Sequence, residues 1–176
     1  DGQTFQAPWV IAADGANGIA RRQLLPHDRY CHAMCLETTI PWDRADQHIV
    51  FNFGSIPGGY GWIFPKGDHA SVGIGTSRKH LNAIRSYYTG FLNTAGIKYA
   101  VPHGVPLAVF NGNRRLTCHR VLFCGDAAHL VDPITGEGLY QALVSGTAAG
   151  RAAATADPAK TYRQEMNRQL LVELRH

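Results

Sequence analysis

One stretch decides the fold expected for this chain: GDAAHLVDPITGEG, residues 125–138. It directly follows the apolar run Val121–Cys124, which predicts a strand buried on both faces, as in a parallel sheet. It ends on Gly-Glu-Gly, and the small residues that continue to Ala156 predict a helix packed closely on that sheet. Because open α/β sheets bind ligands at the carboxyl ends of their strands, the stretch predicts a ligand site between strand and helix.

The residue types in this stretch favour an anionic ligand that also carries hydroxyl groups. Gly125 lets a ligand approach the backbone, and the Asp126 carboxylate can accept hydrogen bonds from a ribose or ribityl hydroxyl. Pro133 fixes the turn, and the helix that opens at Gly138 begins with N–H groups that lack partners within the helix. Those groups and the helix dipole attract negative charge, such as that of a reduced flavin. The alternative is a glycine-rich turn in which Asp126 only caps the helix.

Composition restricts the class of protein. The 176 residues are 45% hydrophobic, which is typical of a globular chain with a real core. The net charge of +4 comes from scattered basic residues without a run of five or six, so nucleic acid is not expected as a partner. No run approaches eighteen apolar residues, so the sequence indicates no transmembrane helix.

The four cysteines predict free thiols in a reducing compartment, which favours a cytoplasmic location. Cys31 and Cys35 are spaced like two ligands of a metal site, but no matching second pair follows them. Structural zinc needs four ligands at recognisable spacing, so we expect no metal here.

Two further regions complete the expected architecture. Trp9–Ala13 predicts a second buried strand that ends at Asp14-Gly15, and Asn17 is expected to cap a short helix after it. Residues 48–75 contain closely spaced strands with Gly and Pro turns, which predict an antiparallel meander. Apolar residues at helical spacing from Leu81 to Ala95 predict a helix that stops at Gly96.

The expected fold class is α/β, or α+β overall. We expect residues 1–22 and 116–156 to form one domain, 23–115 an inserted second domain, and 157–176 the start of a C-terminal helical region. The first domain lacks a Gly-x-Gly-x-x-Gly strand-turn-helix, and two isolated strands do not make a stable sheet. The sequence therefore suggests the C-terminal part of a larger protein, with the N-terminal part as its structural partner.

An aromatic strand in the inserted domain suggests a second site. Tyr60, Trp62 and Phe64 share one face of a strand, and the neighbouring strand offers Gly73 and Gly75 on one face. If the small face lies beside the aromatic one, the sheet gains a shallow trough for a flat or long apolar ligand. The alternative is that these aromatic side chains pack into an ordinary core.

The motifs resemble those of a known group of flavoproteins. Gly125–His129, followed by Pro133, Gly136 and Gly138, is similar to the second FAD fingerprint of p-hydroxybenzoate hydroxylase-like flavoproteins. Val10–Asn17 resembles their Asp-Gly motif. Within this group, Tyr60–Lys66 followed by Gly73-Ile74-Gly75 is similar to the Tyr-x-Trp-x-Phe-Pro-Lys…Gly-x-Gly motif of the geranylgeranyl reductase family.

This resemblance implies a partial Rossmann-like FAD-binding domain with an inserted antiparallel substrate domain. It implies an FAD-dependent oxidoreductase that reduces C=C bonds of an isoprenoid chain on a small molecule or lipid, with NADPH or another reductant as electron donor. A lipid substrate is compatible with peripheral membrane contact. The implied cofactor-binding residues are Asp14, Gly15, Gly125, Asp126, Pro133, Gly136, Gly138 and Leu139. The implied substrate-binding residues are Tyr60, Trp62, Phe64, Pro65, Lys66, Gly73 and Gly75.

Two alternatives remain open at this point, and the sequence names no catalytic residue. The first alternative is an FAD-dependent aromatic-ring monooxygenase. His129 is more typical of those enzymes, whereas Tyr140 and Ser145 stand where they usually have Asn and Asp. The chain could instead be an inactive fragment. Without the adenosine site of the missing N-terminal part, we expect the isolated chain to be colourless and poorly soluble.

Overall fold

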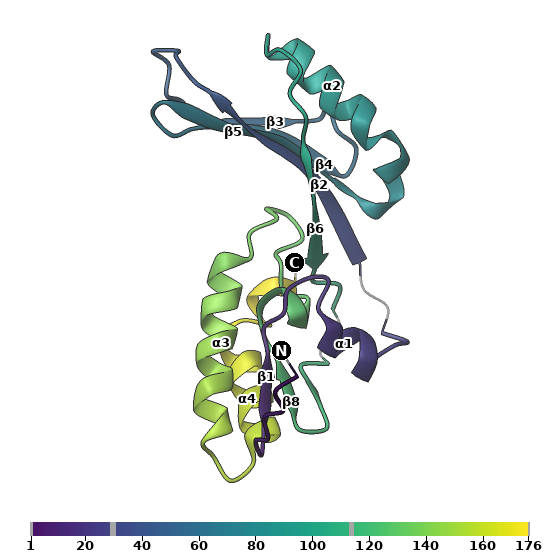
Figure 1. Cartoon of the computed structure of the whole chain (residues 1–176), viewed down its shortest axis with the longest axis vertical. Coiled ribbons are helices and arrows are strands. Elements are labelled where there is room, and N and C mark those ends of the chain that lie inside the picture. Colours follow the sequence, from purple (N-terminus) through teal and green to yellow (C-terminus); the bar gives the residue numbers. More distant parts are fainter. Residues whose placement is uncertain (1, 29–30, 113–114, 176) are drawn as a thin grey trace. The chain divides into compact units, whose positions relative to one another are not determined.

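The computed structural model describes residues 2–28, 31–112 and 115–175, and the chain divides into two compact units (Figure 1). The first unit joins Asp1–Cys31 to Ala108–His176, and the second is His32–Leu107. The expected fold class is confirmed, because an antiparallel sheet is inserted into an α/β unit. The inserted unit is shorter at both ends than the expected range 23–115.

The first unit is built on a small sheet whose strands come from both ends of the chain. Its described strands are β1 (Val10–Ala12), β7 (Thr117–Cys118) and β8 (Val121–Phe123), in the order β1-β8-β7. β1 and β8 pair in parallel, as expected, with Ala12 opposite Phe123. Burial of β1 on both faces is wrong for Val10 and Ile11, which are 52% and 39% exposed. They lie on an edge strand, away from the packed core that begins at Ala12.

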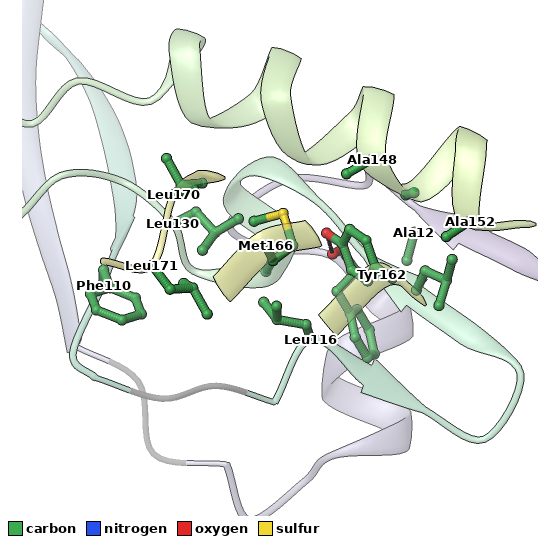
Figure 2. Close-up of a cluster of buried hydrophobic side chains, with 14 of the residues drawn as sticks. Ala12, Phe110, Leu116, Leu130, Ala148, Ala152, Tyr162, Met166, Leu170 and Leu171 are labelled. Carbon is green, nitrogen blue, oxygen red and sulfur yellow. Dashed lines mark hydrogen bonds between the residues drawn. The ribbon is translucent and has the colours of Figure 1, made fainter. Parts of the chain in front are cut away.

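Two helices supply the core that packs with this sheet (Figure 2). They are α3 (Leu139–Ala153) and α4 (Pro158–Gln169). Ala148, Ala149 and Ala152 on α3 are almost completely buried, so the small residues do permit close packing. Tyr162 and Met166 of α4 are also fully buried in this cluster.

The C-terminal residues belong to the first unit, and the helical region expected from residue 157 onwards contains α4. Asp157 caps α4 by accepting the Lys160 N–H at 3.1 Å. The Tyr162 hydroxyl donates to the Phe123 carbonyl of β8 at 2.6 Å. Leu170 and Leu171 continue the buried cluster, and η3 (Glu173–Arg175) follows them. These contacts attach α4 directly to the core around β8.

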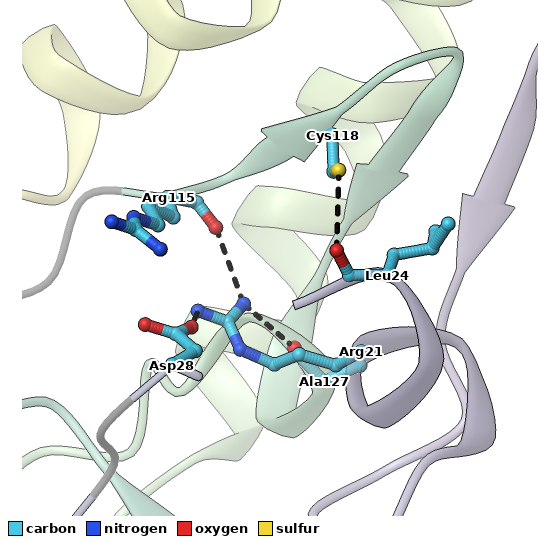
Figure 3. Close-up of polar contacts among 6 residues, drawn as sticks. All are labelled: Arg21, Leu24, Asp28, Arg115, Cys118 and Ala127. Carbon is cyan, nitrogen blue, oxygen red and sulfur yellow. Dashed lines mark hydrogen bonds and ion pairs between the residues drawn. The ribbon is translucent and has the colours of Figure 1, made fainter. Parts of the chain in front are cut away.

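A buried arginine connects segments that are far apart in the sequence (Figure 3). Arg21 lies on α1 (Ile19–Leu24) and is 3% exposed. Its guanidinium pairs with Asp28 and donates to the carbonyls of Arg115 and Ala127, each at 3.2 Å. The same guanidinium lies 5.2 Å from the centre of the Phe123 ring. One side chain therefore joins α1 to the segments before and after β8.

The second unit is a five-stranded sheet, in the order β3-β4-β5-β2-β6 among the described residues. Its strands are β2 (Cys31–Pro41), β3 (Val50–Phe53), β4 (Gly59–Pro65), β5 (His69–Ser77) and β6 (His103–Val109). β3, β4 and β5 form the expected antiparallel meander. The long strand β2 was not predicted, and it pairs antiparallel with β5.

One face of this sheet is covered by α2 (Ile84–Thr94), which follows η1 (Arg78–Ala83) (Figure 1). Tyr88 and Leu92 of α2 pack with Val72 and Ile74 of β5 in a buried cluster. The expected stop at Gly96 is confirmed. This residue has φ +63°, its N–H donates to the Asn93 carbonyl, and the next N–H donates to the Leu92 carbonyl.

We predict that Arg21→Met lowers the free energy of unfolding by about 3–5 kcal/mol, because it leaves the buried Asp28 carboxylate without its cation. The matched control is Arg22→Met, since Arg22 lies on the same helix but is exposed. Urea unfolding followed by circular dichroism measures both. A loss below about 1 kcal/mol for Arg21→Met, comparable to an exposed ion pair, would show that the pair is not a structural anchor.

Candidate functional site

The segment after β8 places Gly125 against α3. Gly125 begins η2 (Gly125–Ala128) with φ +54°, and its N–H donates to the Ser145 hydroxyl at 2.8 Å. A Cβ at this position would lie 3.2 Å from Ala142 Cβ. The requirement for glycine therefore comes from its backbone conformation and from the approach of the helix. The expectation that Gly125 also lets a ligand approach the backbone stays a prediction.

The loop from Asp132 to Glu137 is held by its own hydrogen bonds. Asp132 Oδ1 accepts from the N–H groups of Ile134 and Thr135 at 2.9 and 2.7 Å, and from the Thr135 hydroxyl at 2.9 Å. The Asp132 N–H donates to the Glu137 carbonyl at 2.8 Å. Gly136 has φ +72°, which the closed loop requires. Pro133 thus lies in a stiff turn, which presents the start of α3 in a defined position.

The N-terminus of α3 lies beside Asp126. A Cβ on Gly138 would be 3.3 Å from Asp126 Oδ1, so this glycine allows the carboxylate to approach the first turn. The Tyr140 N–H donates to Glu137 Oε1 at 2.8 Å, a contact that the sequence did not reveal. Among the described contacts, the N–H of Leu139 has no acceptor. The Asp126 carboxylate therefore offers an acceptor and the Leu139 N–H a donor at the start of α3, where Gly138 lets the two come close.

Burial raises the pKa of the Asp126 carboxyl above its usual range. The side chain is half-buried, so it is poorly solvated yet still accessible to a ligand. A hydroxyl that donates a hydrogen bond to a poorly solvated carboxylate stabilises its charged form. This property fits a residue that binds rather than one that only caps a helix.

Asp14 and Gly15 follow β1, at the same sheet edge as Gly125 because β1 and β8 are parallel. Asp14 Oδ2 accepts the Ala20 N–H at 2.9 Å, so Asp14 caps α1 and the predicted cap by Asn17 is wrong. A Cβ on Gly18 would lie 2.3 Å from Asp14 Oδ1. Burial, and secondarily the Asp14 charge, raise the pKa of the Cys124 thiol. A loop that turns back over the strand end makes Asp14, rather than Asn17, the cap.

The second unit carries an aromatic face on the side of the sheet opposite α2. Strand pairing arranges this face in rows across four strands. One row is Phe53, Tyr60, Gly75 and Cys35, and the next is Phe51, Trp62, Gly73 and Glu37. A third row contains Phe64, Ser71 and Thr39. The aromatic side chains lie on β3 and β4, small residues lie on β5, and polar residues lie on β2.

The indole of Trp62 occupies the trough expected above Gly73. A Cβ on Gly73 would lie 2.3 Å from Trp62 Cζ2, and one on Gly75 would lie 3.8 Å from Cζ3. Gly73 therefore makes room for the indole, and the expectation of an open trough above this glycine is corrected. The ring reaches across β5, because its N–H donates to the Ser71 hydroxyl at 3.0 Å. This part of the face is therefore aromatic.

Two aromatic residues of β3 were missed in the sequence and extend this surface. Phe51 and Phe53 stack with their ring centres 6.0 Å apart, and both are more than half exposed. Phe53 contacts Tyr60 at 5.3 Å, and Phe51 contacts Phe64 at 5.2 Å. Alternation along Val50–Phe53 was the available signal, since Phe51 and Phe53 fall on one face. The resulting aromatic surface is continuous from β3 to β5.

The other expected residues of this site have simpler roles. Pro65 ends β4, and the Lys66 N–H donates to the His69 carbonyl at 2.7 Å in the turn between β4 and β5. The Lys66 side chain is exposed. Burial, and secondarily the charge of Glu37, raise the pKa of Cys35 to about 11, so this thiol is neutral at physiological pH. Burial also raises the pKa of Tyr60.

The expected cofactor residues all lie in the first unit and the expected substrate residues all lie in the second. Within the described residues, no three His, Cys, Asp or Glu side chains gather in a group able to hold a metal ion. The side chain of Cys31 lies outside the described residues, so the expectation for Cys31 and Cys35 stays a prediction. No helix of the described chain is long and apolar enough to span a membrane.

Sequence relatives share the inserted unit and its surroundings. The model of the geranylgeranyl reductase catalytic domain matches residues 30–104, which nearly coincide with the second unit. Digeranylgeranylglycerophospholipid reductase of Thermoplasma volcanium is 38% identical over 184 residues, covering 92% of this chain and 44% of the relative. The corresponding protein of Methanosphaera stadtmanae, reductase 3, is 36% identical over 92% of this chain and 44% of its own length. The chain thus spans less than half the length of the curated relatives it matches.

Solved structures show the same fold. A geranylgeranyl bacteriochlorophyll reductase-like protein from Thermoplasma acidophilum superposes with a TM-score of 0.72 and 30% identity, covering 93% of this chain and 45% of that one. PqsL of Pseudomonas aeruginosa, described as a probable FAD-dependent monooxygenase, gives a TM-score of 0.68 at 21% identity, covering 97% of this chain and 54% of that one. At this lower identity the likeness concerns the fold alone.

We predict that Gly73→Ala lowers the free energy of unfolding by about 1–3 kcal/mol, because the new methyl group collides with the Trp62 ring and the Leu36 carbonyl. The matched control is Gly90→Ala in α2, where a Cβ would have no atom within 4 Å. That control should gain about 0.5–1 kcal/mol from helix propensity. Chemical denaturation measures the free energy of unfolding of both variants. A Gly73→Ala protein as stable as the wild type would mean that the indole does not lie over this glycine.

We also predict that Asp126→Asn stabilises the ligand-free protein at neutral pH. A raised pKa means that folding favours the protonated carboxyl, so its contribution to stability is full at low pH and is lost as pH rises through the folded-state pKa. The gain over wild type should therefore vanish below the unfolded value of about 3.9 and grow above it. Thermal melts from pH 3 to pH 8 measure this difference. An advantage for wild type at pH 7 would contradict the burial of this carboxylate.

Proposed function

The chain belongs to the geranylgeranyl reductase family. We propose that it forms part of an FAD-dependent oxidoreductase that reduces C=C bonds in an isoprenoid chain. The observation that carries this proposal is the continuous aromatic surface of β3 and β4, which lies within the residues matched by the catalytic-domain model. Burial of a hydrocarbon chain against such a surface is favourable, and the free energy falls in proportion to the apolar area removed from water.

The residues present in the first unit fit a flavin. The Leu139 N–H has no acceptor among the described contacts and lies at the N-terminus of α3, where a helix favours negative charge. The half-buried Asp126 carboxylate is an acceptor for a ribityl hydroxyl. Gly138 leaves the space through which Asp126 approaches the helix. In this proposal Asp126 holds the ribityl–phosphate region, and the backbone at Gly138 and Leu139 holds the pyrimidine edge.

When bound, reduced FAD would supply a hydride to one alkene carbon while a proton reaches the other, and NADPH or another reductant would restore the reduced cofactor. The chain contributes binding and orientation. Asp14 keeps the turn after β1 closed by capping α1, and the self-bonded loop around Asp132 fixes the start of α3. Fixed N–H donors are worth more than mobile ones, because they need no reorganisation when charge develops near them.

The aromatic surface would hold the isoprenoid chain. Tyr60, Trp62 and Phe64 form its middle, where adjacent ring centres are 5.9 and 6.1 Å apart. Phe51 and Phe53 lengthen it towards the edge strand of the sheet. A surface of this kind excludes water from the bound alkene. If the substrate is a lipid, the exposed side chains of Phe51 and Phe53 also suit contact with a membrane surface.

Aromatic-ring oxygenation is a weaker proposal. The sequence feature that favoured it was His129, which here is 2% exposed and adopts a left-handed conformation at the end of η2. Its N–H donates to the Asp126 carbonyl at 3.0 Å, so this residue closes the short helix. A structural role accounts for its position. Oxygen consumption with an aromatic substrate, in place of alkene reduction, is the reaction that would favour the monooxygenase.

We predict that, in a protein that also carries the expected N-terminal part, Asp126→Ala weakens FAD binding about 5- to 150-fold, which corresponds to the loss of one or two hydrogen bonds to a charged acceptor. Glu173→Gln is the control, because Glu173 is an exposed acid of the same unit. Quenching of flavin fluorescence measures the dissociation constants. Equal affinity in wild type and Asp126→Ala would remove Asp126 from the cofactor site.

Reduction of geranylgeraniol by the flavin-loaded enzyme tests the reaction itself. Mass spectrometry would detect it as a gain of two hydrogen atoms per double bond.

A further inference from the structure

A chain of polar contacts crosses the aromatic surface from β4 to β2. The Trp62 indole N–H donates to Ser71 Oγ at 3.0 Å, and the Ser71 hydroxyl donates to Glu37 Oε1 at 2.6 Å. Trp62 and Ser71 are 8% and 4% exposed, while Glu37 lies half-buried at the border of the face. The three residues come from three adjacent strands, so the contacts fix the indole across the sheet.

The direction of these hydrogen bonds follows from the groups available. An indole N–H can only donate, and a serine hydroxyl has a single proton to donate. Because Ser71 accepts from Trp62 and donates to Glu37, the chain ends on an acceptor. A carboxylate makes that last hydrogen bond charge-assisted, and hence shorter and stronger than a neutral one. Glu37 thereby gives the Ser71 oxygen a fixed orientation towards the indole.

The burial of the indole makes this arrangement necessary, since Trp62 is only 8% exposed and water has little access to it. An isoprenoid chain on this face would exclude the remaining water and could not accept a hydrogen bond from the indole N–H. A buried polar group without a partner costs free energy, so a tryptophan that meets hydrocarbon must find its acceptor within the protein. Ser71 is that acceptor, and Gly73 leaves the space in which the ring lies flat.

We propose that Glu37 is a positioning residue of the isoprenoid site: through Ser71 it holds the Trp62 indole flat over β5 and keeps its N–H satisfied when hydrocarbon covers the ring. The inference rests on the proposed function, because it needs an apolar ligand on this face. Glu37 acts through Ser71 and Trp62 and does not itself react. Neighbouring Cys35 contributes no charge at physiological pH, since burial and the Glu37 charge raise its pKa to about 11.

The test compares four variants: Glu37→Ala, Glu37→Gln, Ser71→Ala and Thr39→Val. Glu37→Gln keeps an acceptor for the Ser71 hydroxyl and removes the charge. Thr39→Val is the matched control, because Thr39 is exposed and lies on the same strand and face as Glu37. Equilibrium dialysis with radiolabelled geranylgeraniol gives the affinity. The Trp62 indole N–H resonance, assigned by its loss in Trp62→Phe, reports the hydrogen bond independently of any ligand, and thermal melts verify that each variant is folded.

We expect Glu37→Ala and Ser71→Ala to bind geranylgeraniol about tenfold more weakly, with an upfield-shifted and faster-exchanging indole N–H. Glu37→Gln should lose less than about threefold, and Thr39→Val should match the wild type. An unchanged affinity in folded Glu37→Ala, or an unmoved indole resonance, would overturn the positioning role and leave the proposed function intact. Failure of the wild type to bind geranylgeraniol would overturn the proposed function itself, and the inference with it.

Discussion

The guanidinium of Arg21 is the group on which the first unit depends. A buried cation is tolerated only when acceptors surround it, and here these come from Asp28, Arg115 and Ala127. The need to satisfy one charge therefore fixes α1 relative to the segments on both sides of β8. Ala127 directly follows Asp126, so the same constraint reaches the candidate cofactor segment. The ring of Phe123 against the guanidinium extends it to the sheet.

Much of this fold could be predicted because its signals are local. The apolar run at Val121–Cys124, the small residues of α3 and the stop at Gly96 each depend on neighbours in the sequence. β2 was not predicted, although Met34, Leu36 and Ile40 alternate along it. Its pairing with β5 is a distant contact that no local pattern reveals. The prediction that Asn17 caps α1 was wrong because Asp14 accepts the Ala20 N–H across a turn, a contact that depends on how the loop folds.

The candidate site was predictable in its composition and less so in its geometry. Alternation placed Tyr60, Trp62 and Phe64 on one face, as the structure has them. It could not give the direction of the Trp62 ring, because that depends on the acceptor Ser71 on the neighbouring strand and on the absence of a side chain at Gly73. Glu37 was overlooked because a lone acid in an unrecognised strand carries no signal. At Gly125 the sequence did not reveal the positive φ or the nearness of Ala142, because both depend on how the segment packs against α3.

The position of the Trp62 ring makes the depth of this face a property of one side chain. The strand beneath it has no side chain at Gly73, and Gly75 is the next residue of that strand on the same face. A smaller residue in place of the indole would lower the floor to the backbone of β5 without rearranging the sheet. Related proteins could thus accommodate thicker or branched hydrocarbons by exchanging a single residue over an unchanged pair of glycines. The same scaffold would then sort its ligands by cross-section rather than by length.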